Sequence, residues 1–360
     1  MSAPAPHDGA VLVTGSTGFI GSRLAHRLGR EGRRVRCLAR PESDTSVLAG
    51  AGAELVRGTL QDVSSLRRAA AGCELVVHCA ALVSDWATVE EIRRANVAGT
   101  RGLLDAAGAA GVRRVVHIST TDVYGHRAGV AVSEDHPPGP FANWYAQTKL
   151  EAERLVTDAP ADLQTVVLRP ATVYGPGSKE VVGEIARAIE AGHMLLIDRG
   201  RALAGLCYVE NLLDAIVLAL DREQAAGEVF NVTDGLSVTW ARFAGDLAAG
   251  LGAPPARLSL PYPAAMAIAV GLEHGYRLAR RLAGIELAPL LSRQAVQVLG
   301  RDQSFSAAKA EAVLGWSPRV GYEDGMRSTL AWLAERPPRA RERRGGGTGH
   351  ARKELDAAGV

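Results

Sequence analysis

Val11-Leu-Val-Thr-Gly-Ser-Thr-Gly-Phe-Ile-Gly21 is the stretch of sequence that decides the fold. Ala10 to Val13 is a short apolar run, which predicts a strand buried on both faces of a sheet. Ser22 to Leu28, after the glycines, has the apolar spacing of a helix. Glycines alone are weak evidence for a binding site, because tight turns use glycine for steric reasons. Their place between a strand and a helix favours a dinucleotide site.

The three glycines each have a mechanical task in such a turn. Gly15 permits the tight turn, Gly18 lets the backbone approach a pyrophosphate, and Gly21 lets the helix pack closely on the strand. The free N–H groups and the dipole at the start of the helix then favour negative phosphates. We expect the whole turn to bind the cofactor, including Thr17, Phe19 and Ile20.

The bulk composition is that of an ordinary globular protein. The chain has 360 residues, enough for a full core and two lobes, with 47% hydrophobic and 22% charged residues. Residues 336–360 hold seven basic and three acidic side chains, a charge of +4, so the rest carries −2 of the overall +2. The body therefore offers no basic surface for nucleic acid. We expect the tail to be a disordered, solvated extension.

Cysteine usage and the N-terminus indicate a reducing compartment, so we expect a cytoplasmic protein without a metal site. Four cysteines lie in or beside apolar runs without metal-ligand spacing, which predicts buried free thiols. They are Cys37, Cys73, Cys79 and Cys207. Residues 1–9 lack the pattern of a signal peptide. The longest uncharged apolar stretch, 258–272, contains two prolines and is too short to span a bilayer, although contact with a membrane surface stays open.

Strand and helix patterns alternate after the first unit. The expected strands cover 34–39, 54–57, 75–80 and 114–119, and the expected helices cover 63–71 and 89–108. Such alternation with apolar strands predicts a doubly wound parallel sheet with helices on both faces. Ligands of such sheets bind at the carboxyl ends of the strands. We therefore expect cofactor contacts from Thr59, Leu60, Ala80 and Ala81.

Arg40 closes the second expected strand, the position that reads the adenosine ribose in this architecture. A carboxylate there binds the ribose hydroxyls and selects NAD, whereas an arginine suits the 2′-phosphate of NADP. Arg36 lies two residues earlier and could share the same face of the strand. The sequence therefore favours NADP(H) and leaves NAD(H) open, because an arginine at a strand end is often only solvated.

A second informative stretch, Asn143 to Arg154, has a helical pattern that contains Tyr145 and Lys149. Their spacing of four residues places phenol and ammonium on one helix face. A nearby cation stabilises a phenolate and would lower the pKa of Tyr145 from its usual value of about 10. The pair could therefore act as a general acid/base. This spacing is also common on amphipathic helices, so the interpretation depends on the other motifs.

Gly15-x-x-Gly18-x-x-Gly21, the strand-end Ser119-Thr120 and Tyr145-x-x-x-Lys149 together resemble the extended short-chain dehydrogenase/reductase family, within the NAD-dependent epimerase/dehydratase superfamily. The resemblance runs from about Val11 to Leu333. Supporting matches are Asn96-Val97-x-Gly99-Thr100, Leu168-Arg169-Pro170 and Val173-Tyr174-Gly175-Pro176-Gly177. Leu314-Gly315-Trp316-Ser317-Pro318 and other C-terminal motifs are most similar to the 3β-hydroxysteroid dehydrogenase-like branch.

The resemblance implies a role for each matching residue. Tyr145 would be the acid/base, and Lys149 would hold the nicotinamide ribose and lower the pKa of the tyrosine. Thr120 would hydrogen-bond the reacting oxygen, and Asn96 would support either a water relay or a helix bend. The sequence Gly58-Thr59-Leu60 departs from relatives that carry an aspartate for the adenine amino group, although Thr59 can still hydrogen-bond.

The resemblance also implies two discontinuous lobes. Residues 10–174 with 208–232 would form the NADP-binding domain, where Pro170 and Val173 meet the cofactor. Residues 175–207 with 233–335 would form a smaller, mostly helical substrate lobe. Relatives commonly dimerise through the helices expected at 89–108 and 143–156, so the resemblance implies a homodimer.

The leading functional hypothesis is an NAD(P)-dependent oxidoreductase that interconverts a secondary alcohol and a ketone on a hydrophobic substrate, sterol-like or keto-acyl. The alternative is a nucleotide-sugar epimerase or dehydratase with tightly bound NAD. A third interpretation, a non-catalytic dinucleotide-binding protein, is disfavoured because both Tyr145 and Lys149 are present.

Two stretches bear on this choice. Similar dehydratases carry Thr-Asp-Glu where this chain has Thr120-Thr121-Asp122, so one carboxylate is missing and the other is shortened. Similar epimerases often carry Arg-Asp-aromatic where this chain has Ala204-Gly205-Leu206, and their arginine grips a substrate phosphate. Arg199 or Arg201 could take its place if the loop folds differently. We expect the pocket beyond Tyr145 to be mainly aliphatic and to lack a diphosphate clamp.

Overall fold

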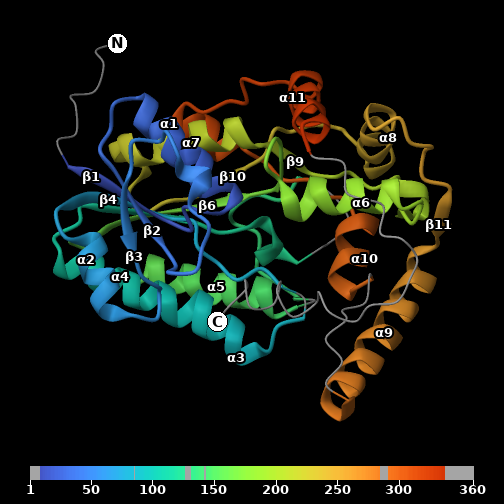
Figure 1. The fold of residues 1–360 in the computed structure, drawn as a ribbon, viewed down its shortest axis with the longest axis horizontal. Helices are drawn as coiled ribbons and strands as arrows, with labels where there is room; N and C mark the ends of the chain where they lie inside the picture. The colour runs from blue at the N-terminus through green and yellow to red at the C-terminus, as the bar shows by residue number, and fades with distance from the viewer. Residues whose placement is uncertain (1–8, 85, 126–130, 142, 284–290, 337–360) are drawn as a thin grey trace.

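The computed structural model describes residues 9–84, 86–125, 131–141, 143–283 and 291–336. Within them, seven parallel strands form one sheet in the order β10-β6-β5-β4-β1-β2-β3 (Figure 1). From β1 the strand order runs outward to β2 and β3 on one side and to β4, β5, β6 and β10 on the other. Open doubly wound sheets bind ligands at this topological switch point. This confirms the predicted fold. The strands are β1 (Ala10–Thr14), β2 (Val35–Ala39), β3 (Glu54–Arg57), β4 (Cys73–His78), β5 (Arg114–Ile118), β6 (Gln164–Pro170) and β10 (Val229–Val232).

Helices cover both faces of the sheet, and most of its strands are therefore buried on both sides (Figure 1). Leu24 and Leu212 bring two helices onto one face, and Leu66 and Leu103 bring others onto the opposite face. The tail beyond residue 336, for which we predict disorder, lies outside the described residues. The covering helices are α1 (Phe19–Arg30) and α7 (Val209–Asp221) above the sheet, and α2 (Val63–Ala70), α4 (Gly99–Ala109) and α5 (Trp144–Thr157) below it.

The helix expected over residues 89–108 is present but irregular. It begins as α3 (Val89–Arg93), widens into a π-helical segment over Arg94–Ala98 and continues as α4. Thr88 and Glu91 form a capping box at its start. Asn96 lies within the π-helical segment, and such segments are frequent at functional sites.

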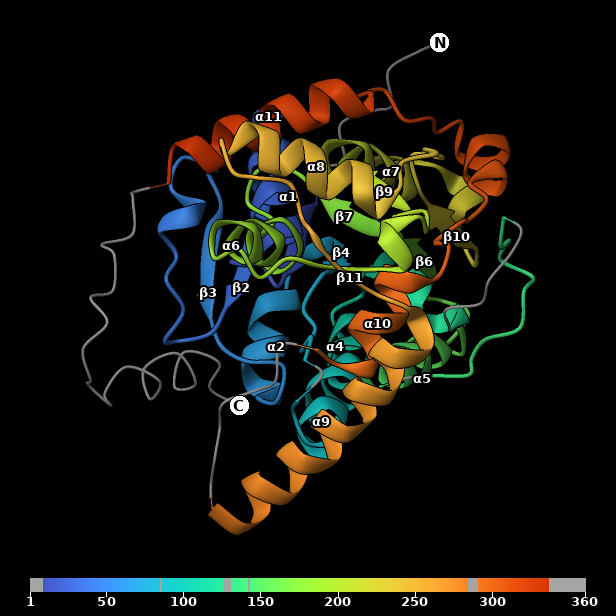
Figure 2. The same ribbon diagram turned by 90° about the vertical axis from the view of Figure 1, so that its right-hand side faces the viewer.

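The two small sheets and the helices named below, which lie between residues 172 and 334, are called the C-terminal lobe. Its core is aromatic, with Tyr174, Trp240 and Phe243 buried against one another. Figure 2 shows that α9 extends away from the body of the molecule. The lobe contains two small parallel sheets, β7 (Thr172–Tyr174) with β9 (Leu206–Tyr208) and β8 (Leu195–Ile197) with β11 (Leu258–Leu260). Its helices are α6 (Glu184–Glu190), α8 (Trp240–Gly250), α9 (Tyr262–Ala283), α10 (Arg293–Gly300) and α11 (Tyr322–Ala334).

A buried ion pair ties α5 to the sheet. Arg169 on β6 donates to the Glu153 carboxylate of α5, with Nη2 to Oε2 at 2.7 Å. Ser119, just after β5, donates to the same carboxylate. Arg169 also donates to the Tyr124 hydroxyl at 2.7 Å, and Tyr124 donates to Asn231 of β10 at 2.7 Å. These contacts hold the helix that carries Tyr145 and Lys149 in one place against three strands.

The four cysteines are free thiols, as predicted. Cys37, Cys73 and Cys207 are buried, and Cys79 is partly buried. Burial raises the pKa of the Cys37 thiol to about 11, which keeps it protonated and unreactive. Among the helices described, none combines the length and apolar character needed to cross a membrane.

Candidate active site and cofactor pocket

The glycine turn has the geometry that its sequence predicts. Gly15 has φ of +65°, and a Cβ there would lie 2.7 Å from the Ala80 nitrogen. A Cβ at Gly21 would lie 2.3 Å from the Gly15 oxygen, so only glycine lets α1 pack this closely. Gly18 precedes α1, and no described side chain caps the first turn of that helix. Its backbone N–H groups can therefore hold phosphate.

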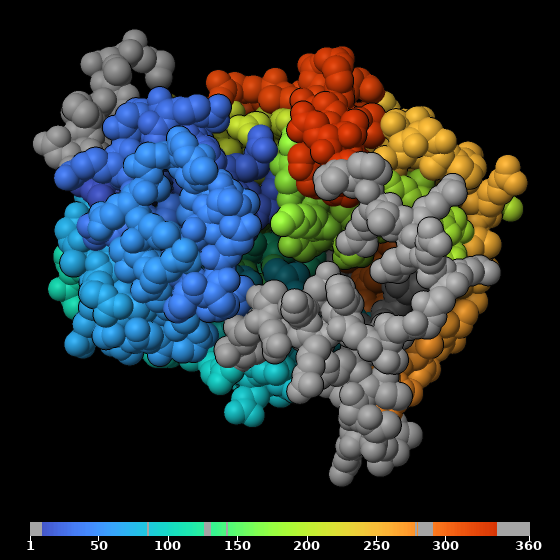
Figure 3. All heavy atoms as spheres, in the orientation of Figure 1, coloured from blue at the N-terminus to red at the C-terminus, as the bar shows by residue number. Residues whose placement is uncertain are grey.

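A hollow of about 660 Å³ lies over this turn, at the carboxyl ends of β1 to β4. Figure 3 shows it where the blue surface of the N-terminal strands meets the green surface near residue 180. Its size and its mixture of apolar side chains with a glycine turn fit a dinucleotide. Of the residues expected to bind the cofactor, it is lined by Gly15, Thr17, Gly18, Arg40, Thr59, Leu60, Ala80 and Ala81.

The other expected cofactor residues lie elsewhere. The Phe19 ring packs with the C-terminal lobe and lies beside Gly177. Ile20 packs against the hydrophobic core that the sheet forms with α1 and α7. Val173 packs against the hydrophobic core of the main sheet and against that of the C-terminal lobe. Pro170 is buried at the end of β6. Among the described residues, the hollow is lined by none of Phe19, Ile20, Gly21, Pro170, Val173, Tyr145 or Lys149.

Two carboxylates that the sequence analysis did not select also line the hollow. Glu42 lies beside Arg40, with Arg40 Nε 3.4 Å from Glu42 Oε1. Glu180 reaches the hollow from the C-terminal lobe. Glu42 could have been noticed as an acid two residues after the strand-end arginine. Glu180 could not, because only the fold brings residue 180 to this edge.

Arg36 does not share the position of Arg40, contrary to our expectation. Its Nε donates to Glu54 at 2.9 Å, and its Nη1 donates to the carbonyl oxygens of Ala69 and Ala71 at the end of α2. These contacts direct the side chain toward α2 and away from the hollow. Of these two arginines, only Arg40 lines the hollow.

The residues expected to be catalytic meet at the ends of β5 and α5. Asn143 caps α5 by accepting from the Ala146 N–H at 3.0 Å, which fixes the helix start one turn before Lys149. Tyr145, in the first turn, lies near Thr120. The buried Lys149 Nζ donates to the Ile118 carbonyl oxygen at 2.7 Å and lies 3.2 Å from His117 Nε2. The structure thus brings together the three side chains predicted to work as a unit.

The pKa of Tyr145 shifts upward, opposite to our expectation. Burial and the Asp122 carboxylate both raise the pKa, and the hydrogen bond with Thr120 opposes them. The ammonium expected to lower it is directed at the Ile118 carbonyl. Burial lowers the pKa of Lys149 to about 8, against the attraction of Glu153. As described, the site holds a protonated phenol.

Asn96 fills the helix-bend role rather than an open site. Its Oδ1 accepts from the Leu82 N–H at 2.7 Å, and its Nδ2 donates to the Leu82 carbonyl and to Thr148 Oγ1. The π-helical segment thus places one amide against both the loop after β4 and helix α5. Through Thr148, which precedes Lys149, Asn96 ties this segment to helix α5.

A smaller hollow of about 220 Å³ separates the start of α5 from the C-terminal lobe. On the side of α5 it is lined by Ile92, Phe141 and Trp144 together with polar Ser84, Asn143 and Gln147, and its wall in the C-terminal lobe is polar throughout. The polar residues are Glu273, Arg277, Arg293 and Gln294. The described lining therefore differs from the aliphatic surface that we expected from this lobe. Residues 284–290, next to α10 in the chain, lie outside the described residues.

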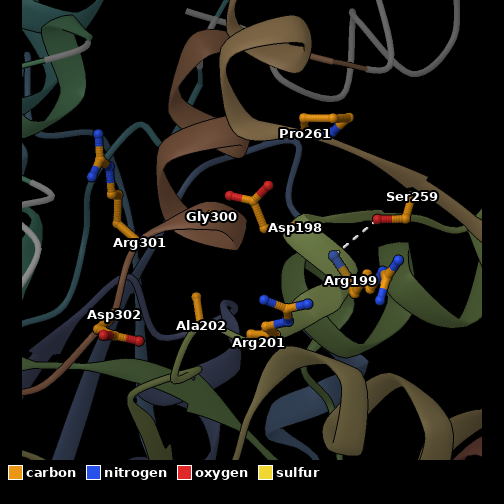
Figure 4. A pocket seen from close by; sticks show the side chains of 9 residues that line it. All are labelled: Asp198, Arg199, Arg201, Ala202, Ser259, Pro261, Gly300, Arg301 and Asp302. Carbon is orange, nitrogen blue, oxygen red and sulfur yellow. Dashed lines mark hydrogen bonds between the residues drawn. The ribbon is translucent and has the colours of Figure 1, made fainter.

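A third hollow, of about 650 Å³, lies wholly within the C-terminal lobe (Figure 4). Arg199 and Arg201 come from the turn after β8, and Arg301 extends away from them on another wall. Among the described residues, these arginines have no carboxylate within ion-pair distance. Ala204 and Leu206, where similar epimerases carry a clamp, are buried in the core instead.

A doubly wound sheet with a glycine turn at its switch point, beside a tyrosine–lysine helix, defines a dinucleotide-binding enzyme of the Rossmann type. The family model described as "NAD dependent epimerase/dehydratase family" matches residues 11–233, more than half of the chain. The chain therefore belongs to this family.

Two relatives show the branch. The 4-hydroxy-2-methyl-3-oxo-4-farnesyl-3,4-dihydroquinoline-1-oxide ketoreductase of Stigmatella aurantiaca is 36% identical, covering 88% of this chain and 94% of the relative. The 3 beta-hydroxysteroid dehydrogenase/Delta 5-->4-isomerase of Mycobacterium tuberculosis is 29% identical, covering 90% of each. With relatives named as reductases and dehydrogenases, this chain is an enzyme, an NAD-dependent oxidoreductase of the epimerase/dehydratase family.

A solved structure is similar over nearly the whole chain. The structure titled "MoeE5 in complex with UDP-glucuronic acid and NAD" has a TM-score of 0.71 and 29% identity, covering 91% of this chain and 99% of that one. Nucleotide-sugar enzymes are thus structural neighbours of this chain, while the relatives named above are ketoreductase and dehydrogenase.

Proposed function

We propose that this chain interconverts a ketone and a secondary alcohol on a hydrophobic substrate, with NADP(H) as its preferred cofactor. The observation that carries the proposal is the juxtaposition of Thr120 and Tyr145, with Lys149 one helical turn away. The family membership and the ketoreductase and dehydrogenase relatives support it. The direct test is a panel of apolar ketones and alcohols in which consumed cofactor is compared with formed product.

Each catalytic residue has a distinct task in this proposal. A bound nicotinamide would supply or accept the hydride. Tyr145 donates its phenolic proton to the carbonyl oxygen during reduction and takes a proton back during oxidation. Thr120 donates a hydrogen bond to the same oxygen and orients it. Lys149 would hold the nicotinamide ribose, and its hydrogen bond to the Ile118 carbonyl fixes where the ammonium lies.

We also propose that the two lobes divide the work. Residues 10–174 with 208–232 would bind the cofactor, and residues 175–207 with 233–335 would bind the substrate. The polar far wall near Gln294 suggests that a hydrophobic substrate presents a polar group to this lobe. Its apolar part would then lie against Phe141 and Trp144.

Arg40 supports the choice of NADP(H). Its guanidinium lines the hollow at the end of β2, and a charge-assisted contact with the 2′-phosphate strengthens binding. We expect Arg40→Asp to weaken NADPH binding at least about tenfold and to leave NADH binding unchanged or improved. The two dissociation constants can be measured side by side by fluorescence titration.

A substitution at the neighbouring Glu42 should change NADPH affinity in the opposite direction. Glu42→Gln removes a carboxylate that pairs with Arg40, so NADPH should bind more tightly. Arg257→Asp makes the same charge change as Arg40→Asp at an exposed position of the C-terminal lobe and should alter neither affinity. If the unaltered protein binds NADH more tightly than NADPH, the assignment of Arg40 is wrong.

We further propose a homodimer built on α3, α4 and α5. Val89 and Trp144 are exposed large side chains on this side of the molecule, at 37% and 41%. Packing these helices against a second copy would bury them in a four-helix contact. Light scattering at micromolar concentration should give twice the monomer mass, and Trp144→Glu should lower it. A monomeric unaltered protein contradicts the proposal.

One observation favours a second candidate function, a nucleotide-sugar epimerase or dehydratase with tightly bound NAD. Arg199 and Arg201 line a hollow without carboxylate partners among the described residues, and an anionic substrate group would suit them (Figure 4). We rank it second because Thr121 stands where similar dehydratases have an aspartate. Tight binding of a uridine or thymidine diphosphate sugar, with conversion and no net cofactor change, would establish it.

A further inference from the structure

We propose that His117 on β5 is a positioning residue: its Nε2 accepts a hydrogen bond from the Lys149 ammonium and, together with the Ile118 carbonyl oxygen, fixes where that ammonium lies. The inference rests on the proposed function for the task of Lys149, while the contact itself belongs to the folded chain. It gives a task to a residue outside every motif that indicated the family.

His117 lies on the face of β5 that α4 and α5 cover. Val116 and Ile118, its neighbours in the strand, pack on the opposite face with α1 and α7, since successive side chains of a strand alternate. The His117 side chain is fully buried. A strand buried on both faces is normally a continuous apolar run, and His117 interrupts it where the strand meets Lys149.

Lys149 is buried and makes two hydrogen bonds, both to β5. Its Nζ lies 2.7 Å from the Ile118 carbonyl oxygen and 3.2 Å from His117 Nε2. An ammonium has three N–H donors and no acceptor, so β5 engages two of them. Among the described residues the third donor has no partner, which leaves it for the cofactor ribose. The two acceptors hold a side chain whose long stem is otherwise flexible.

The contact determines which nitrogen of His117 carries the proton. Because an ammonium can only donate, Nε2 must hold the lone pair and Nδ1 must hold the proton. Burial and the nearby Lys149 and His78 hold the pKa of His117 well below its usual range, so the ring is neutral. Nδ1 is buried without a hydrogen-bond partner among the described residues, and such a donor destabilises a fold. The contact with Lys149, rather than packing, therefore explains this histidine.

His78 is the register partner of His117 on β4 and has the opposite arrangement. The centroids of the two rings lie 5.1 Å apart. Thr100 Oγ1 donates to the Asn96 carbonyl oxygen at 2.6 Å, so it accepts from His78 Nε2 at 2.9 Å. His78 Nδ1 then accepts from Thr14 Oγ1 at 2.7 Å. Both nitrogens of His78 are occupied by hydroxyls, and only His117 offers a lone pair to the ammonium.

The first test observes the contact without cofactor or substrate. ¹⁵N spectra of the histidine rings in the full-length protein near neutral pH distinguish a protonated nitrogen from one with a lone pair. We expect the proton of His117 on Nδ1 and that of His78 on Nε2, each ring being assigned by its substitution with glutamine. In Lys149→Met, the His117 Nε2 resonance should move toward that of a nitrogen without a hydrogen bond. A His117 ring protonated on Nε2 in the unaltered protein overturns the inference.

The second test measures what the contact does. His117→Met removes the acceptor and should weaken binding of the preferred cofactor, NADPH or NADH, about tenfold. His117→Gln keeps an acceptor oxygen near the position of Nε2 and should recover most of the affinity. In the Lys149→Met background, His117→Met should add no further loss, because the donor is gone. His193→Met, at an exposed position of the C-terminal lobe, should leave the affinity unchanged.

Activity then separates this inference from the proposed function. With an active ketone, His117→Met should lower turnover about tenfold, and His117→Gln should restore most of it. An unchanged cofactor affinity in His117→Met, or an equal loss with and without Lys149, overturns the inference. The expected spectra and affinities in a protein that reduces no ketone overturn the proposed function and leave the contact between His117 and Lys149 supported.

Discussion

Replacing Tyr145 with phenylalanine should lower turnover by about a hundredfold or more, while cofactor affinity stays within about twofold. The substitution removes one hydroxyl and keeps the ring, so the packing of α5 is retained. The lost hydroxyl is the group that lies near Thr120 and that carries the transferable proton. Single-turnover kinetics with a saturating ketone and NADPH measure the loss at the chemical step.

Two further variants make the result specific to Tyr145. Tyr322→Phe removes another tyrosine hydroxyl, one that donates to Asp246 at 2.7 Å within the C-terminal lobe, and should leave turnover near normal. Lys149→Met should lower both turnover and cofactor affinity, because the ammonium serves the ribose as well as the tyrosine. A Tyr145→Phe enzyme with near-normal turnover removes this helix from the mechanism.

The second large effect concerns stability rather than chemistry. Arg169→Met should lower the free energy of unfolding by about 3–5 kcal/mol, because it leaves the Glu153 carboxylate buried without its cation. Arg169 and Glu153 side chains are only 11% and 3% exposed. Urea denaturation followed by circular dichroism gives the change in midpoint.

The controls for this prediction use the same chemistry in other settings. Arg327→Met breaks an ion pair with Asp324 in which both side chains are mostly exposed, and should cost less than about 1 kcal/mol. The double variant Arg169→Met with Glu153→Met buries no unpaired charge and should recover part of the loss. If Arg169→Met costs no more than Arg327→Met, the buried pair does not hold α5 against the sheet.

Local sequence was sufficient to predict most of the cofactor domain. The apolar strand before Gly15 and the helix after it were expected and are present. Each of these patterns depends only on residues close together in the sequence. A continuous apolar run marks a strand buried on both faces, and apolar residues at helical spacing mark the amphipathic helix that covers it. The family resemblance gave a helix bend as one of two roles for Asn96, whereas the apolar pattern of residues 89–108 predicted a regular helix without the π-helical segment.

The predictions that differed from the structure depend on contacts between distant segments. The direction of Arg36 is set by carbonyl groups at the end of α2, and Glu180 reaches the cofactor hollow only through the fold. The pKa of Tyr145 depends on where the Lys149 ammonium points and on the nearness of Asp122. Neither is encoded in the spacing of four residues that led to the acid/base prediction. The hydrogen bond from Gln294 to Asp122 spans 172 positions and left no local signal.

The stoichiometry of cofactor and product tests the central claim most directly. The purified enzyme is incubated with NADPH and a panel of apolar ketones, and in parallel with uridine and thymidine diphosphate sugars. Loss of reduced nicotinamide is followed by absorbance, and products are identified by mass spectrometry. We predict that one NADPH is consumed for each secondary alcohol formed, with no conversion of the sugars. Conversion of a diphosphate sugar without net change in nicotinamide, and no ketone reduced, would contradict the account.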